Sequence, residues 1–179
     1  MIKKLKNIYG FTVIEMLVVA SIMVLLLTIT VVNFRGFEKS QIVETETEKL
    51  ASVLRQAQVW TLVGQTVGGS RYNYGVHLEE CTALTTCSYI LFRDIDWDSH
   101  YDTGEEVSGH TYSFLQGVYV ETLDPQDGGD LDVLFVPPLA NVFFNGLDIS
   151  EAKIDIISNL SSNTNSITIN QVSGQIEIE

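Results

Sequence analysis

The sequence predicts an α+β protein in which a long N-terminal α-helix packs on an antiparallel β-sandwich-like globular head. The first half of this helix is expected to span a membrane and the second half to be amphipathic. Three observations carry the prediction. Residues 16–34 bear no charge, apolar residues within 39–65 recur at intervals of three and four, and apolar and polar residues alternate after residue 64. These patterns are typical of a membrane helix, an amphipathic helix and half-buried strands.

Composition limits the classes of protein to consider. The chain has 179 residues, of which 45% are hydrophobic, with 23 acidic against 10 basic residues. So much apolar surface excludes a disordered chain. The acidity argues against nucleic acid as a partner, because polyanion binding needs clustered Lys and Arg.

The uncharged run at 16–34 is long enough to cross a hydrocarbon core of roughly 30 Å. Lys3, Lys4 and Lys6 all precede it. By the positive-inside rule, the N-terminus is expected to stay cytoplasmic and the chain after about residue 35 to be exported. A secretory signal peptide and a plain signal anchor are the alternatives. The signal peptide is disfavoured because no small-residue cleavage site follows Val32, and the plain signal anchor does not explain Glu15.

The region 36–64 is expected to form the amphipathic half of the helix, with one apolar stripe packed on the head. The stripe consists of Val43, Leu50, Val53, Leu54, Ala57, Trp60 and Val63. Residues 65–179 are expected to form the exported β-rich head. Its candidate strands are 72–78, 88–93, 111–115, 117–123, 131–136, 141–144, 153–157, 166–172 and 175–179, with a tight turn at Ser173-Gly174.

The N-terminal stretch KKLKNIYGFTVIEMLVVASIM resembles the class III leader of type IV pilins and type II secretion pseudopilins. The resemblance implies that residues 1–10 are a leader that a prepilin peptidase removes after Gly10, with N-methylation of Phe11. The segment 11–35 then corresponds to the family's transmembrane and filament-core helix. Glu15 matches the carboxylate that neutralises the α-amino group of a neighbouring subunit, so it is expected to direct assembly. A carboxylate at this place in an apolar stretch is costly unless it finds such a partner.

Looser similarities along the chain resemble H-type minor pseudopilins and related minor pilins. They lie in LASVLRQAQVWTLVGQTV, YGVHL, YILFRDIDWDSHYDTGEEV, LDVLFVPPLANVFFNG and SITINQVSGQIEI. The resemblance implies a structural subunit, a minor one being favoured, of a type IV pilus or a type II secretion pseudopilus. Its partners would be other subunits, the prepilin peptidase, the assembly platform and the membrane. The expected location is the cytoplasmic membrane, crossed once, and then a periplasmic or cell-surface filament.

An acidic segment in the head has the spacing of a calcium-binding loop. Oxygen ligands of an EF-hand-like site are predicted at Asp94, Asp96, Asp98, Asp102 and Glu105, with the backbone of His100 as a further ligand. Ser99 stands where such loops have a glycine. The alternative is a solvated acidic turn. A second acidic stretch, 124–132, contains Pro125 and two glycines and is interpreted as a turn.

Cys81 and Cys87 are six residues apart and are expected to form a disulfide in an exported domain. A zinc site would need two more nearby ligands, and His77 is the one candidate close in sequence. No nucleophile elbow, phosphate-binding loop or HExxH motif is present, so an enzyme is not expected. Three alternatives to the favoured function remain open: a DNA-capturing competence pilin, a major pilin, and a non-polymerising membrane-anchored calcium-dependent adhesin or enzyme.

Overall fold

The computed structural model describes residues 10–82, 85–125, 128–138, 141–159 and 161–179, and leaves out the side chains of 30–40 and 161–163. The described chain forms two compact units, Met1–Glu38 and Lys39–Glu179. Most of the predicted leader, residues 1–9, lies outside the described residues.

Helix α1 runs from Val13 to Val63 and crosses the boundary between the two units. It ends where Gly64 adopts a φ of 68°, a left-handed conformation that favours glycine. The Gly64 N–H donates to the Thr61 carbonyl oxygen at 3.1 Å, and the Gln65 N–H donates to the Trp60 carbonyl oxygen at 2.9 Å. These two bonds form a Schellman motif, which satisfies carbonyl groups at the helix end.

The expectation of one long N-terminal helix packed on a sheet, with a membrane-spanning first half, is wrong. The helical residues whose side chains are described form two shorter stretches, Val13–29 and Gln41–63, which belong to different units. Neither is long and apolar enough to cross a membrane. The single-pass location in the cytoplasmic membrane is therefore corrected as well.

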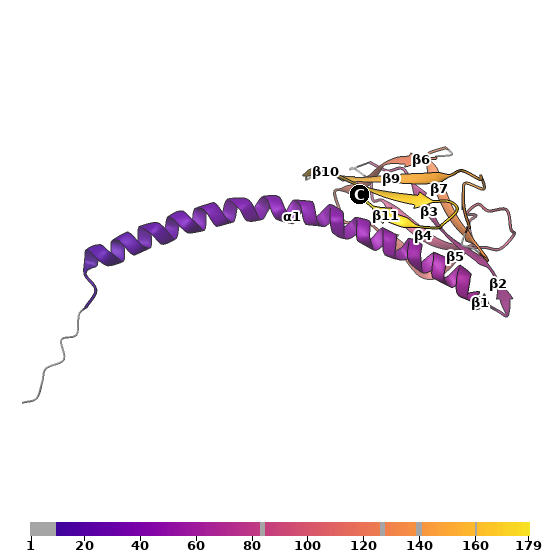
Figure 1. Ribbon diagram of the computed structural model, residues 1–179, viewed down its shortest axis with the longest axis horizontal. Coiled ribbons are helices and arrows are strands. Elements are labelled where there is room, and N and C mark those ends of the chain that lie inside the picture. Colours follow the sequence, from indigo (N-terminus) through magenta and orange to yellow (C-terminus); the bar gives the residue numbers. More distant parts are fainter. Residues whose placement is uncertain (1–9, 83–84, 126–127, 139–140, 160) are drawn as a thin grey trace, which may run out of the picture. The chain divides into compact units, whose positions relative to one another are not determined.

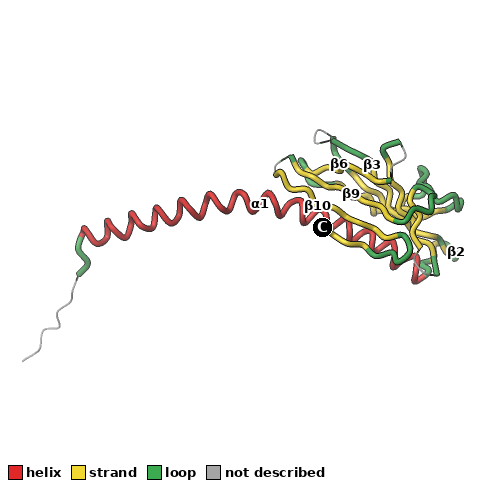
Figure 2. Tube along the Cα trace, turned by 45° about the horizontal axis from the view of Figure 1, so that its top comes forward, coloured by secondary structure: helices red, strands yellow, loops and turns green. Residues whose placement is uncertain are grey.

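The second unit contains three antiparallel sheets (Figure 1; Figure 2). The five-stranded sheet has the order β5-β4-β3-β7-β8. Its strands are β3 (Asn73–Glu79), β4 (Ser88–Asp94), β5 (Glu106–Ser113), β7 (Asp130–Val136) and β8 (Asn141–Phe144). The four-stranded sheet has the order β11-β10-β9-β6, from β6 (Val118–Asp124), β9 (Glu151–Ser158), β10 (Ser161–Asn170) and β11 (Ile176–Ile178). The small hairpin β1 (Thr66–Val67) and β2 (Ser70–Arg71) follows the helix.

The Gln41–63 stretch packs on both larger sheets and supplies one side of the core. Leu50, Leu54 and Ala57 of the predicted stripe are fully buried in one cluster with residues of both sheets, whereas Val63 is 74% exposed. The Thr61 hydroxyl accepts a hydrogen bond from the Tyr74 N–H of β3. On the other side, the Gln58 side chain donates to the Gly174 carbonyl oxygen at 2.9 Å, next to β11.

Most strands follow the predicted alternation, with differences at three places. One is β10, which begins at Ser161, whereas 166–172 was expected. The β1–β2 hairpin was not predicted, because two-residue strands are too short to show a period. Strand β5 begins at Glu106, whereas 111–115 was expected. Its register against β4 jumps from Ile90↔Thr111 to Phe92↔Glu106, so the residues between form an irregular bulge. Such bulges make an edge strand a poor template for pairing with another chain.

Candidate functional site

The N-terminal segment is exposed along its whole described length before residue 30. Gly10 and Phe11, the predicted processing residues, are both exposed, and the Phe11 side chain is 77% exposed. Large apolar side chains are exposed on every side of the helix; they include Val13, Ile14, Leu17, Ile22, Val24, Leu25 and Ile29. A helix that is apolar all round is normally covered by other protein or lipid. The exposed apolar surface of this unit is therefore of the kind that other protein or lipid covers.

Glu15 has a local role that the sequence interpretation missed. The Thr12 hydroxyl accepts a hydrogen bond from the Glu15 N–H at 3.3 Å, and the Glu15 carboxylate accepts one from the Thr12 N–H at 3.4 Å. This reciprocal pair is a capping box, which satisfies two backbone donors at the start of the helix. The signal was available in the sequence, because Thr and Glu stand three residues apart at the beginning of the apolar run.

The acidic loop, residues 94–106, leaves the end of β4 and returns into β5. Asp94, Asp96 and Asp98 each offer a carboxylate oxygen, and these oxygens lie within 4.8 Å of one another. Asp94 is 1% exposed, whereas Asp96 and Asp98 are exposed. The structure thus brings three of the predicted calcium ligands together at the start of the loop.

The remaining predicted ligands are not part of that group. Glu105 is buried, and its two carboxylate oxygens accept hydrogen bonds from the backbone N–H groups of Ile95, at 2.6 Å, and Asp102, at 3.1 Å. Asp102 itself is exposed, and no other cluster of three metal-binding side chains occurs in the part of the chain that the structure describes. Glu105 closes the base of the loop instead of joining the cluster.

Backbone donors already hold the carboxylates of the cluster. Asp94 accepts from the Trp97 N–H at 2.7 Å, and Asp98 accepts from the His100 N–H at 2.8 Å. The turn is tight, since Trp97 and Ser99 have φ values of 68° and 71°. Residue 99 therefore adopts the left-handed backbone conformation for which calcium-binding loops use glycine, although it is a serine.

Burial of the acidic loop affects its protonation. Desolvation raises the pKa of Asp94, partly opposed by the hydrogen bond from the Trp97 N–H, and the charge of Asp98 raises it further. Burial likewise raises the pKa of Glu105, against the hydrogen bonds from the Ile95 and Asp102 N–H groups. Burial therefore disfavours the charged form of both carboxyl groups.

A polar network fixes the loop on the five-stranded sheet. Asp132 of β7 lies opposite His77 of β3, and its Oδ1 is 2.6 Å from His77 Nδ1. The other oxygen of Asp132 accepts from the Tyr101 N–H at 3.1 Å, and the Tyr101 ring packs on the His77 ring with centroids 4.4 Å apart. The Asn145 side chain accepts from the Asp132 N–H at 2.6 Å. Sequence reasoning missed this network because its members are 13 to 55 residues apart.

The second acidic stretch does not form a metal cluster within the described residues. Asp132 takes part in the network above, Asp124 ends β6, and Asp127 lies outside the described residues. The interpretation of this stretch as a turn is consistent with the positive φ values of Gly128 and Gly129.

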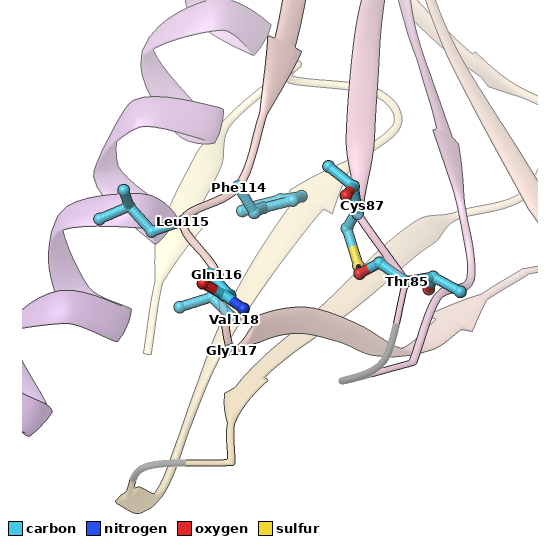
Figure 3. Close-up of a pocket in the computed structure, with 8 residues that line it drawn as sticks. Thr85, Cys87, Phe114, Leu115, Gln116, Gly117 and Val118 are labelled. Atoms are coloured by element: carbon cyan, nitrogen blue, oxygen red, sulfur yellow. Dashed lines mark hydrogen bonds between the residues drawn. The ribbon is translucent and has the colours of Figure 1, made fainter.

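The predicted disulfide between Cys81 and Cys87 is confirmed, with an S–S distance of 2.07 Å and Cα atoms 5.7 Å apart. Its loop joins the two larger sheets, because the Cys81 N–H donates to the Val120 carbonyl oxygen of β6 at 3.3 Å. A cavity of about 340 Å³ opens beside it, lined by Thr85, Thr86, Cys87 and the segment 114–118. Figure 3 shows this cavity between the Cys87 side chain and the segment from Phe114 to Val118.

A second hollow of about 440 Å³ lies between the helix and the edge of the five-stranded sheet. The helix residues Thr45, Glu48, Lys49, Ser52, Val53 and Gln56 and the stacked rings of Tyr89 and Tyr112 line it. Neither cavity contains one of the predicted site residues apart from Cys87. They offer no arrangement of nucleophile, base and oxyanion donors.

Comparisons of the chain with models of known protein families, with curated proteins and with solved structures found no match.

Proposed function

We propose that this chain is a structural subunit of a filament similar to type IV pili and type II secretion pseudopili, and that it assembles through residues 11–29. The observation that carries the proposal is the exposure of apolar side chains on all sides of the helix in the first unit. Copies of the same segment, packed side by side, would remove that surface from water. The leader-like sequence around Gly10 and Phe11 supports the same reading, with processing before assembly.

The described architecture of the second unit suits a filament subunit. The core is formed by a helix and two larger sheets. Of their four edge strands, β8 and β11 are short, and β5 and β6 each contain a register shift. Such edges discourage strand pairing between second units. Association would then depend on the first unit and on side-chain surfaces.

A single substitution on the apolar segment tests the proposal. Val24 is 64% exposed, and a Val24→Asp variant places a charge where neighbouring copies would pack. We expect this variant to be made and folded but to be absent from isolated filaments. Ser52→Asp adds the same charge at an exposed position of the helix in the second unit and serves as the matched control. Normal incorporation of Val24→Asp would contradict the proposal.

We also propose that the acidic loop binds one Ca²⁺ through Asp94, Asp96 and Asp98. The grouping of their oxygens within 4.8 Å favours it, since hard carboxylate ligands are what calcium takes. Calcium should raise the melting temperature of the protein, and a chelator should reverse the change. Asp96→Asn combined with Asp98→Asn should abolish the calcium-dependent increase, whereas Asp102→Asn should leave it in place. An identical melting temperature with calcium and with chelator would remove the site.

A further inference from the structure

Three basic residues follow Gly64: Arg71, Arg93 and Lys153. Among the described residues, the two arginines have no acidic partner. The Lys153 ammonium pairs with the Asp155 carboxylate at 3.0 Å. Within the described residues, neither arginine side chain forms an ion pair or a hydrogen bond. In a chain where acidic residues outnumber basic ones by 23 to 10, cations without a carboxylate require an explanation.

Arg71 lies against Gly64 at the end of helix α1, and Arg93 lies over the ring of Tyr72, the residue that follows Arg71. The guanidinium carbon of Arg93 is 5.7 Å from the centroid of the Tyr72 ring. Arg93 is half-buried, and its Nε is buried without an acceptor. Arg71 is exposed and leans on Gly64, where its Nε would lie 3.2 Å from a Cβ at that position. Figure 1 shows β2, which ends at Arg71, beside the end of α1. We call Arg71, Tyr72 and Arg93 the arginine patch.

The negative C-terminal end of the helix dipole explains only part of why two arginines lie in this region. The last turn of α1 has no basic residue, so cations supplied by the strands are favourable there. However, the carbonyl oxygens of Thr61 and Trp60 already accept bonds from the Gly64 and Gln65 N–H groups. A guanidinium carries five N–H donors in a planar fork that matches a carboxylate. The donors of the arginine patch therefore remain open to an acceptor outside the chain.

The acidic loop begins at the same end of the sheet as the patch. Arg93 and Asp94 are consecutive residues of β4, so their side chains point to opposite faces of the sheet. Asp96 and Asp98 follow and are exposed. Each copy thus carries a cationic surface and an exposed acidic surface near the end of one strand. Among the described residues no ion pair joins the two surfaces within one copy, so both are open to a second copy.

We propose that the arginine patch binds the calcium-free acidic loop of a second copy of this chain. The charge complementarity between the two surfaces identifies the occupant. This contact belongs to the second unit and goes beyond assembly through residues 11–29. Its ion pairs would fix the orientation of neighbouring copies, whereas the apolar segment would bury the larger surface area.

The test measures self-association of the full chain by analytical ultracentrifugation, with a mild detergent covering residues 11–29 and a chelator keeping the acidic loop free of cations. Wild-type protein should associate at low ionic strength and dissociate as salt is added, because exposed charges are screened. Arg71→Glu and Arg93→Gln should each raise the dissociation constant by about tenfold or more. Lys153→Gln removes a charge that is already paired and should leave association unchanged.

Exchanging the charges of the two surfaces tests whether the arginine patch contacts the acidic loop itself. Asp96→Lys should weaken self-association as Arg71→Glu does, and a mixture of these two variants should associate again. Near-ultraviolet circular dichroism checks that Arg93→Gln is folded, and the exposed Arg71 gives a second variant if it is not. The proposal is overturned if wild-type protein stays monomeric at low salt, or if Lys153→Gln weakens association as strongly as Arg71→Glu. Binding of inorganic phosphate to the patch without self-association would also overturn it.

Discussion

Three substitutions separate the capping role of Glu15 from its proposed role between subunits. Glu15→Gln keeps an oxygen that can accept the Thr12 N–H, because glutamine also serves in capping boxes, but it removes the charge. Glu15→Ala removes both the cap and the charge. Thr12→Ala removes the hydroxyl that accepts from the Glu15 N–H and leaves the carboxylate untouched.

The two roles of Glu15 differ in the free energy that their loss is expected to cost. The capping bonds measure 3.3 and 3.4 Å at an exposed site, so losing the cap should cost about 1 kcal/mol, or roughly a fivefold change in an equilibrium. If Glu15 neutralises a cation inside a packed filament, removing its charge leaves that cation unpaired, which costs about 3–5 kcal/mol. That loss corresponds to at least a hundredfold lower incorporation.

The assay is competition between variant and wild-type chains for isolated filaments, quantified by mass spectrometry against the total chain made. We expect Glu15→Gln and Glu15→Ala to be incorporated at least a hundredfold less than wild type, and Thr12→Ala about fivefold less. If Glu15→Gln is incorporated like wild type while Thr12→Ala and Glu15→Ala are equally impaired, Glu15 is only a cap and the assembly role is refuted.

Three further predictions concern the second unit. Replacing Cys81 and Cys87 together by alanine should lower the free energy of unfolding by about 2 kcal/mol, measured by urea denaturation, because the closed loop is short; an unchanged midpoint would contradict this. Ser99→Gly should raise stability by about 1 kcal/mol, since the φ of 71° strains a residue with a Cβ, and a lower melting temperature would argue against that strain. Burial lowers the pKa of His77, but the hydrogen bond and charge of Asp132 raise it more, so the pKa is raised overall. The stabilisation is therefore fully present below the ordinary His pKa of ~6.5 and is lost as pH rises through the raised value, and His77→Gln should abolish this pH dependence of unfolding.

The sequence predicted the parts of the fold that follow from local periodicity. The stripe through Leu50, Leu54 and Ala57 is buried as expected, and the longer strands coincide with the alternating runs. The membrane-spanning expectation rested on the uncharged run 16–34, but no helix among the described residues is long and apolar enough to cross a membrane. Glu46 lies three residues after Val43 and four before Leu50, on the same helix face as the stripe, and it is 1% exposed and pairs with Lys49. The stripe was listed from its apolar residues alone, so this buried carboxylate was missed.

The candidate site was predictable where its residues are close in sequence. The grouping of Asp94, Asp96 and Asp98 and the Cys81–Cys87 disulfide depend on short spacings. By contrast, Asp132 reaches His77 across 55 residues and the Tyr101 N–H across 31, and these contacts depend on strand order. Strand order is set by the whole core, so this network could not be inferred from one segment.

Cross-linking from the apolar segment within intact filaments tests the central claim most directly. A photoactivatable residue at Leu25, which is 60% exposed in the single chain, would report what covers that position after assembly. The account predicts cross-links between residues 11–29 of neighbouring copies, and none between them in chains kept apart by detergent. Filaments that form normally with no cross-link from Leu25 to another copy would contradict the account.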